Sequence, residues 1–505
     1  MFRIFGPPGT GKTTTLLNMV DEALEKGVHP HRIAFLAFTR KAANEAKERA
    51  AARFNLDPKR DLIYFRTLHS LALTMTDIRS EQVMQEENYR ELSRSIGVAL
   101  GGSRNQSFDE DVPSMVASSD PILGLINLAR LKKVPLRQQY NESSIEYDWN
   151  TVKYVDECLR SYKQNLNLYD FTDMLQRFVD QAERFCPNFD LCFLDEAQDL
   201  SNLQWDIADI LDAKSTRMYA AGDDDQAIYR WAGANVDRFI NLPGGSETLS
   251  QSYRVPSEVH RLAENVVKRI GRRFPKRYEP RQEPGRVMRI NTINSLDMSD
   301  GSWLILSQAG YQLTPVAADL KSNGYLFTYR GHRSISEKIS DAVNGWEQLR
   351  KGRQVTGETA RKIYSYMSVG ERVKRGFKKL PNLSDDQLIG LEELIADHGL
   401  LADVSMIWST AMDKLPDTDR AYITALLRRG EKFNGIPRIT ASTIHGSKGG
   451  EADNVVLFTD ISPAADEQMR LNPDDMHRVF YVGITRTKQN LYIVDAEDVS
   501  RSYDL

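Results

Sequence analysis

Gly6-Pro7-Pro8-Gly9-Thr10-Gly11-Lys12-Thr13 is the stretch of this sequence that decides the fold. Apolar residues from Phe2 to Phe5 predict a buried strand before it, and those from Leu16 to Val20 predict a helix after it. A glycine loop between strand and helix lets backbone N–H groups approach phosphate oxygens, and the helix N-terminus adds its dipole. Lys12 is expected to reach the β- and γ-phosphates, and Thr13 to ligate Mg²⁺. The context therefore predicts a phosphate-binding loop, which alone does not distinguish a kinase from a GTPase or a motor.

Two later strand ends carry polar side chains that suit the same site. Residues 191–194 are apolar and predict a strand that ends in Asp195 and Glu196. Asp195 is expected as a Mg²⁺ ligand, and Glu196 as the general base for an attacking water. A third strand is predicted over residues 217–221, and Gln226 after it is a candidate sensor of the γ-phosphate.

Aromatic residues follow this candidate sensor directly. Tyr229, Arg230 and Trp231 stand three to five positions beyond Gln226. Two aromatic rings and an arginine in this place favour stacking on nucleic-acid bases. The alternative is that Trp231 belongs to the hydrophobic core.

Length, composition and net charge say less about function than these motifs do. The 505 residues predict three or four domains, and the 41% hydrophobic and 27% charged residues are typical of a folded globular protein. A net charge of −4 counts mildly against a nucleic-acid binder. Two stretches are nevertheless basic: residues 268–289 and 351–379 each hold nine Lys and Arg against two Glu. Each stretch is either a solvated face or a set of contacts to DNA phosphates.

Cysteine usage and hydropathy point to the cell interior. Cys158, Cys186 and Cys192 have no spacing that suits a zinc or iron–sulfur site, so all three are expected as buried thiols. No apolar run approaches the roughly 18 residues that span a bilayer. The first residues contain no secretory signal pattern. We expect a cytoplasmic protein in a reducing compartment, without membrane contact.

Eight ordered motifs resemble those of the UvrD/Rep/PcrA group of superfamily 1 DNA helicases. The segments similar to motifs I, Ia, Ib, II, III, IV, V and VI are residues 6–14, 37–43, 67–70, 193–199, 222–234, 249–254, 443–451 and 481–486. Residues 170–175 also resemble the short segment that precedes motif II in this family. The similarity thus extends from the first loop almost to the last residue.

The resemblance implies an α/β fold with two RecA-like P-loop motor domains, each carrying a mostly helical inserted subdomain. The first motor domain (1A) would comprise residues 1–75 and 165–243, with an insertion (1B) at 76–164. The second motor domain (2A) would comprise residues 244–335 and 435–505, with an insertion (2B) at 336–434. Within 1B, the Gly/Ser/Asp-rich residues 101–113 are expected to form a loop.

The resemblance also implies a role for individual residues. Tyr253 would stack on adenine, and Glu451 would hold the ribose. The expected catalytic residues are Lys12, Glu196, Gln226, Arg254 and Arg486, the two arginines contacting the γ-phosphate. The expected nucleotide-binding residues are Gly6, Pro7, Pro8, Gly9, Thr10, Gly11, Lys12, Thr13, Thr14, Tyr253, Arg254, Glu451 and Arg486. The expected path of single-stranded DNA is lined by Phe38, Thr67, His69, Tyr229, Trp231 and His445.

The implied activity is an ATP- and Mg²⁺-dependent DNA helicase that moves 3′→5′ on single-stranded DNA and unwinds duplex. Its partners would be single-stranded and forked DNA, and replication, repair or recombination proteins are candidates. The alternative is a translocase or ATP-switched clamp that displaces or recruits proteins with little unwinding. An RNA helicase is less favoured because no motif announces 2′-OH contacts. A metabolic kinase would leave motifs III to VI unexplained.

Two departures from the family concern the chain ends. Motif I begins at Gly6, which leaves no room for the family's preceding segment with its adenine-reading glutamine. Adenine selection would then depend mostly on Tyr253, so we expect weak discrimination between ATP and GTP. The chain ends about nineteen residues after Arg486, so no nuclease domain is expected.

Overall fold

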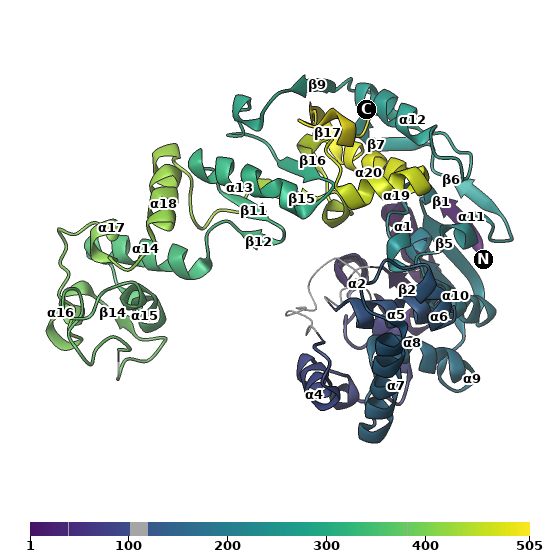
Figure 1. Ribbon diagram of the computed structural model, residues 1–505, viewed down its shortest axis with the longest axis horizontal. Coiled ribbons are helices and arrows are strands. Elements are labelled where there is room, and N and C mark those ends of the chain that lie inside the picture. Colours follow the sequence, from purple (N-terminus) through teal and green to yellow (C-terminus); the bar gives the residue numbers. More distant parts are fainter. Residues whose placement is uncertain (39, 101–119, 381) are drawn as a thin grey trace.

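Two separate β-sheets organise the computed structural model, which describes residues 1–38, 40–100, 120–380 and 382–505. The loop expected at residues 101–113 lies outside the described residues. Figure 1 shows the N-terminal sheet at the lower right and the C-terminal sheet at the top, with residues 337–429 projecting to the left. Mixed α/β architecture with parallel sheets confirms the predicted fold class.

The first sheet is parallel throughout and has the strand order β3-β2-β4-β5-β1-β6. Its strands are β1 (Phe2–Phe5), β2 (Ile33–Ala37), β3 (Phe65–Thr67), β4 (Phe189–Leu194), β5 (Ser215–Gly222) and β6 (Ser246–Thr248). Strand β6 lies beyond the expected domain boundary at residue 243. Helices cover both faces, so β2 is buried at all five positions.

The two faces of the first sheet have separate cores. Odd-numbered residues of β2 pack against α1 (Lys12–Glu25) and α2 (Arg40–Phe54). Even-numbered ones join the core formed by α3 (Leu68–Met75), α8 (Phe171–Asp180) and α10 (Asn202–Ala213). Short helices α9 (Ala182–Phe185) and α11 (Val236–Ile240) complete this half. The alternation of side chains along each strand therefore fixes which helices meet which face.

The second sheet has the order β12-β11-β15-β10-β16-β17-β9, and all pairs except β11 with β12 are parallel. Its strands are β9 (Arg286–Ile290), β10 (Trp303–Ser307), β11 (Phe327–Tyr329), β12 (His332–Arg333), β15 (Ile439–Thr443), β16 (Ala452–Phe458) and β17 (Thr487–Val494). The strand predicted at residues 303–306 is confirmed as β10. The helices of this half are α12 (Ser257–Val267), α13 (Leu313–Ser322), α19 (Pro463–Leu471) and α20 (Pro473–Ile484). Strands β7 (Gln251–Pro256) and β8 (Glu279–Arg281) pair separately beside it.

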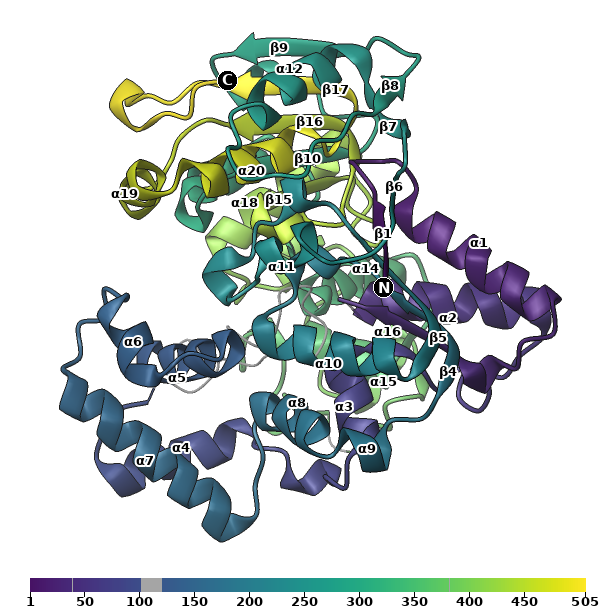
Figure 2. The same cartoon turned by 90° about the vertical axis from the view of Figure 1, so that its right-hand side faces the viewer.

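A helical insertion interrupts the first sheet between β3 and β4. It contains α4 (Glu86–Ile96), α5 (Pro121–Lys132), α6 (Leu136–Asn141) and α7 (Trp149–Leu166), which share a small core of their own. The helices predicted at residues 86–96 and 152–165 are confirmed as α4 and α7. Figure 2 shows these helices at the lower left, to one side of the first sheet.

A second insertion interrupts the C-terminal sheet between β12 and β15. It contains α14 (Glu337–Arg350), α15 (Gly357–Ser365), α16 (Leu391–Asp397), α17 (Trp408–Ala411), α18 (Asp417–Arg429) and the paired strands β13 (Val355–Thr356) and β14 (Leu388–Ile389). Helices predicted at residues 335–349 and 417–428 are confirmed. A helix over 386–397 is wrong in its first half, because residues 388–389 pair with β13 and Gly390 caps α16 instead.

Two smaller expectations are also resolved. Cys186 and Cys192 are buried free thiols, but Cys158 is only half-buried on α7, so the prediction for that residue is wrong. Within the described ranges, no helix is long and apolar enough to cross a membrane.

Candidate functional site

The first loop joins β1 to α1 at the carboxyl edge of the first sheet, as its sequence predicts. Gly9 and Gly11 adopt left-handed φ angles of 71° and 75°. A Cβ at Gly9 would lie only 2.4 Å from Cβ of Arg254, which belongs to β7 beside the other sheet. Glycine is therefore required here both for the backbone conformation and for the close approach of a second segment.

Asp195 and Glu196 meet the loop where β4 ends. Thr13 donates from Oγ1 to Asp195 Oδ2 over 2.7 Å, and Lys12 Nζ lies 2.5 Å from Glu196 Oε1. Glu196 has a φ of 56°, a conformation that non-glycine residues adopt rarely and usually at functional sites. Burial alone would raise the pKa of Glu196, but Lys12 and Lys448 lower it to about 2. Glu196 is therefore a carboxylate at neutral pH.

Gln226 contacts a residue of the second sheet's domain. Its Nε2 donates to Asp223 Oδ2 over 2.6 Å, and its Oε1 accepts from Arg486 Nη2 over 2.7 Å. Arg486 follows α20 and is buried, and burial together with the nearby Arg254 lowers its pKa to about 9. Three side chains, from both halves of the chain, thus form one hydrogen-bonded line.

Strand β7 is hydrogen-bonded to the glycine loop itself. Ser252 Oγ donates to the Pro8 carbonyl over 2.8 Å, and the Tyr253 N–H donates to the Gly9 carbonyl over 2.8 Å. The Tyr253 side chain is 73% exposed, so its ring is open to a flat partner.

Lys448 and Lys488 are two residues of this cluster that sequence analysis missed. Lys448 Nζ contacts the Asp199 carboxylate and donates to the Gln226 carbonyl over 2.9 Å. Lys488 Nζ lies 2.6 Å from Glu451 Oε1, while Arg254 Nε donates to Glu451 Oε2 over 2.6 Å. Lys448 lies within the motif V segment and Lys488 lies two residues after motif VI, so their positions were a signal in the sequence. Their acidic partners, however, lie far away in sequence.

Phe38, Tyr229, Trp231 and His445 form one aromatic cluster. Phe38 stacks on Tyr229 with ring centroids 5.7 Å apart, and His445 lies 6.1 Å from Trp231 edge to face. Trp231 is 49% exposed and therefore is not a core residue, whereas Tyr229 is only 3% exposed. Trp231 is thus the member of the pair whose face is accessible, with Tyr229 behind it.

Thr67 ends the neighbouring strand β3, and His69 lies in the first turn of α3. Thr67 pairs with Ala37 in the sheet, one residue before Phe38, and its side chain caps α3 by accepting from the Ser70 N–H. The His69 ring packs against Phe171 instead of the aromatic cluster, and burial lowers its pKa to about 4. The structure therefore brings Thr67 next to the cluster and turns His69 toward α8.

The first basic stretch contains both buried and exposed cations. Lys268, Arg269, Arg272, Arg277, Arg286 and Arg289 are exposed, and their contact with DNA stays a prediction. Lys276 is 1% exposed on its side chain, and its Nζ lies 3.0, 2.6 and 2.6 Å from carboxylates of Asp223, Asp224 and Asp225. Arg273 forms a two-pronged pair with Asp225. The charges of Lys276 and Arg273 are therefore neutralised within the protein. In the second stretch Lys351, Arg353, Lys374, Arg375 and Lys379 are exposed, and their contact with DNA stays a prediction.

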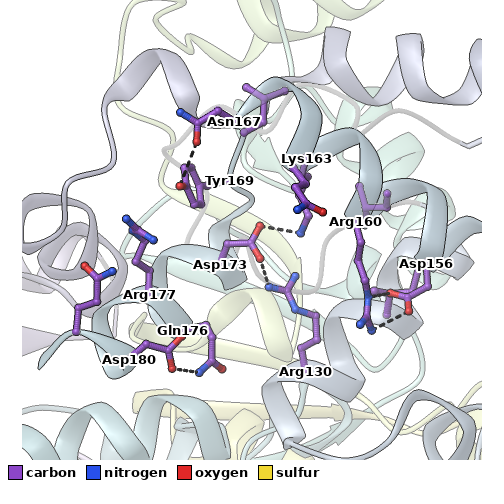
Figure 3. Close-up of a pocket in the computed structure, with 15 residues that line it drawn as sticks. Arg130, Asp156, Arg160, Lys163, Asn167, Tyr169, Asp173, Gln176, Arg177 and Asp180 are labelled. Carbon is purple, nitrogen blue, oxygen red and sulfur yellow. Dashed lines mark hydrogen bonds and ion pairs between the residues drawn. The ribbon is translucent and has the colours of Figure 1, made fainter.

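A cavity of about 650 Å³ lies between the first insertion and α8. Figure 3 shows Arg130 and Lys163 from the insertion pointing toward Asp173 of α8, and Arg160 paired with Asp156. This network explains the segment at 170–175: its two aspartates anchor the insertion on the first sheet. No sequence-predicted site residue lines the cavity.

The residues present fit a magnesium nucleotide. A hydroxyl and a carboxylate are the hard oxygen ligands that Mg²⁺ takes, and the ion keeps several waters and phosphate oxygens besides. Thr13 and Asp195 supply that pair beside the glycine loop. Across the described part of the chain, no group of three or more His, Cys, Asp or Glu could hold a metal by itself.

Comparisons with known proteins agree with this geometry. Residues 2–244 match the UvrD/REP helicase N-terminal domain family, and residues 438–494 match the UvrD-like helicase C-terminal domain family. The ATP-dependent DNA helicase PcrA of Bacillus subtilis is 24% identical over 97% of this chain and 80% of its own length. PcrA of Leuconostoc citreum is 27% identical over 54% of this chain, and PcrA of Staphylococcus aureus 24% over 54%; each match spans 38% of that relative.

Proposed function

The chain belongs to the UvrD/Rep-type helicase family, whose members are ATP hydrolases, and on that premise we propose that it is an ATP-driven DNA motor. It would move along single-stranded DNA, 3′→5′ as the family resemblance suggests, and unwind duplex ahead of it. The observation that carries the proposal is the Arg486–Gln226 hydrogen bond of 2.7 Å between the two halves of the site.

ATP hydrolysis would take place between the glycine loop and Arg486. Glu196 accepts a proton from a water whose oxygen bonds to the γ-phosphorus, the bond to the bridging oxygen breaks, and ADP and phosphate leave. Lys12, Arg254 and Arg486 offset the charge on the transferring group. Mg²⁺, held by Thr13 and Asp195, would supply further charge neutralisation. Arg486 contributes only when the two halves are close, which links hydrolysis to closure.

Nucleotide orientation would come from the second half of the chain. The exposed Tyr253 ring would stack on the base. Glu451, beside Arg254, would accept hydrogen bonds from the ribose. Because Tyr253 and Gly9 are joined by a backbone hydrogen bond, the base and the phosphates would be held by one connected unit.

DNA movement would be coupled through Gln226. Only two residues separate it from Tyr229, which supports the exposed Trp231. A shift of the Gln226 segment on closure would therefore move the stacking surface, and release of products would let the strand advance. Residues 1–75 with 165–243 and residues 244–335 with 435–505 would be the two motor domains. The protein partners proposed for such an activity are replication, repair or recombination proteins.

The test uses forked duplexes and duplexes with a single-stranded tail of either polarity. The full chain should separate a 3′-tailed or forked duplex with ATP, but a 5′-tailed duplex poorly, and Glu196→Gln should separate none. A parallel assay follows displacement of streptavidin from biotinylated single strands. Protein displacement without strand separation would identify the alternative, a translocase or clamp; loss of DNA-stimulated ATP hydrolysis in the wild type would reject the motor altogether.

A further inference from the structure

Lys488 lies beside the nucleotide site at the start of β17. Thr487 pairs with Ala452 of β16 and is buried, so the alternation along the strand turns Lys488 outward. Its Nζ lies 2.6 Å from Oε1 of Glu451, the residue that immediately precedes β16. Neither the ordered motifs nor the family resemblance assigns Lys488 a role.

Glu451 is held by two cations, one on each carboxylate oxygen. Lys488 takes Oε1, and Arg254 donates to Oε2 over 2.6 Å. The Glu451 side chain is 38% exposed, and a carboxylate has about four lone-pair sites, so the group can accept from a further donor. Burial would raise the pKa of Glu451, but Arg254 and Lys488 lower it, which keeps the group ionised and an acceptor.

The two cations are not equivalent in how they are attached. Lys488 and Glu451 stand at the ends of adjacent, directly paired strands of the seven-stranded sheet, so they move together. Arg254 stands on β7, which pairs with β8 in a separate two-stranded sheet and is hydrogen-bonded to the glycine loop. When a nucleotide binds, Arg254 is therefore the cation that can leave Glu451 to contact a phosphate. Lys488 is the cation that stays on Glu451.

We propose that Lys488 is a positioning residue that holds the Glu451 carboxylate in place to accept a hydrogen bond from a ribose hydroxyl, so that the site selects ribonucleotides. The proposal rests on the proposed function, because it takes ATP to be hydrolysed at this site. With Lys488 in place, the carboxylate keeps a counter-ion when Arg254 turns to the phosphates. Without it, Glu451 would retain Arg254 or rotate away from the sugar.

The experiment is steady-state hydrolysis of ATP, 2′-deoxyATP and 3′-deoxyATP by the full chain with single-stranded DNA. In the wild type, at least one deoxy analogue should have a KM about tenfold above that of ATP, the loss expected for one hydrogen bond to a charged group. Lys488→Met should raise the KM for ATP about tenfold and that for the analogue less than twofold, with kcat nearly unchanged. Lys488→Arg should keep the preference, and Glu451→Gln should lose it.

Lys153→Met is the matched control, since Lys153 is an exposed lysine on α7 that pairs with a glutamate, Glu157, 3.7 Å away. It should leave every KM unchanged. An equal KM increase for all three nucleotides in Lys488→Met would indicate simple attraction of phosphates and overturn the proposal. If Lys488→Met keeps the preference for ATP over the deoxy analogue while Glu451→Gln loses it, the role of Lys488 is rejected. The proposed motor function would be unaffected by that result. A wild type that hydrolyses none of the three nucleotides would instead reject the proposed function.

Discussion

Arg486 donates a hydrogen bond from Nη2 to Oε1 of Gln226 over 2.7 Å, although the two residues are 260 positions apart. Gln226 follows a strand of the first sheet, and Arg486 precedes a strand of the second. The same Gln226 side chain donates to Asp223 over 2.6 Å, which fixes which of its ends faces the arginine. This pair therefore connects the hydrolysis site directly to the segment that leads to the aromatic cluster.

Replacing Gln226 should uncouple the two activities. Gln226→Ala removes both hydrogen bonds of the amide but leaves Lys12, Glu196 and Arg486 in place. We therefore expect ATP hydrolysis without DNA to stay within a few-fold of wild type. Stimulation by single-stranded DNA should fall at least tenfold, because the contact that reports closure is gone. Gln138→Ala, which removes an exposed glutamine paired with Glu142 on α6, is the control. Full stimulation in Gln226→Ala would contradict the coupling route.

Replacing Arg486 should affect chemistry more than binding. Arg486→Ala removes a cation that would stabilise charge on the transferring phosphoryl group, an effect of about 10³-fold or more on kcat. Binding of a fluorescent ATP analogue should weaken much less. Arg486→Lys should rescue little, because an ammonium does not reproduce the guanidinium fork that reaches Gln226 and the phosphate together. A variant with normal kcat would show that Arg486 is structural.

Most of the hydrolysis site was predictable because it follows buried strands directly. The glycine loop, Asp195 and Gln226 each come within four residues of a strand end, and parallel strands present those ends at one edge. The sequence also indicated the helical insertions by their periodicity. The burial of Lys276 could not be predicted, because its acidic partners stand about fifty residues away in sequence. Composition alone does not distinguish a buried lysine from one on the surface.

The aromatic residues show the same limit. Spacing favoured base stacking for both Tyr229 and Trp231, yet only Trp231 is exposed while Tyr229 is covered by Phe38 and His445. Burial of a single ring depends on the packing of three segments far apart in the sequence, which no local pattern encodes. Tertiary contacts thus decide which member of an aromatic pair has a free face.

Asp199 should make stability depend on pH in a defined window. Burial raises the pKa of the Asp199 carboxyl from its ordinary 3.8 to about 6, although Lys448 opposes this. Between about pH 4 and 6 the folded state therefore binds more protons than the unfolded state, and this group's contribution to stability falls as pH rises. Melting temperatures of wild type and Asp199→Asn should thus diverge most in favour of the wild type near pH 4. A constant difference from pH 4 to 7 would contradict the raised pKa.

Removing Lys276 should destabilise the protein rather than weaken DNA binding directly. Its ammonium is the shared counter-ion of three buried carboxylates, and a buried pair that loses one partner typically costs about 3–5 kcal/mol. Lys276→Met should lower the melting temperature by several degrees in differential scanning fluorimetry. Lys268→Met, an exposed lysine of the same basic stretch 3.5 Å from Glu264, should leave it unchanged. Equal melting temperatures for both variants would show that the buried cluster adds no stability.

Trp231 should matter for DNA and not for ATP. Its ring is 49% exposed at the edge of the aromatic cluster, where a base could stack on it. Loss of one base–aromatic stack costs about 1–3 kcal/mol, so Trp231→Ala should weaken binding of single-stranded oligonucleotides about five- to 150-fold. Hydrolysis of ATP without DNA should stay near wild type, because the rings beside Trp231 in the described structure are Tyr229 and His445, which belong to the aromatic cluster. Fluorescence anisotropy with a labelled oligonucleotide measures the affinity, and Trp149→Phe, on α7 of the insertion, is the aromatic control. Unchanged affinity in Trp231→Ala would exclude stacking on this ring and shift the DNA path away from the cluster.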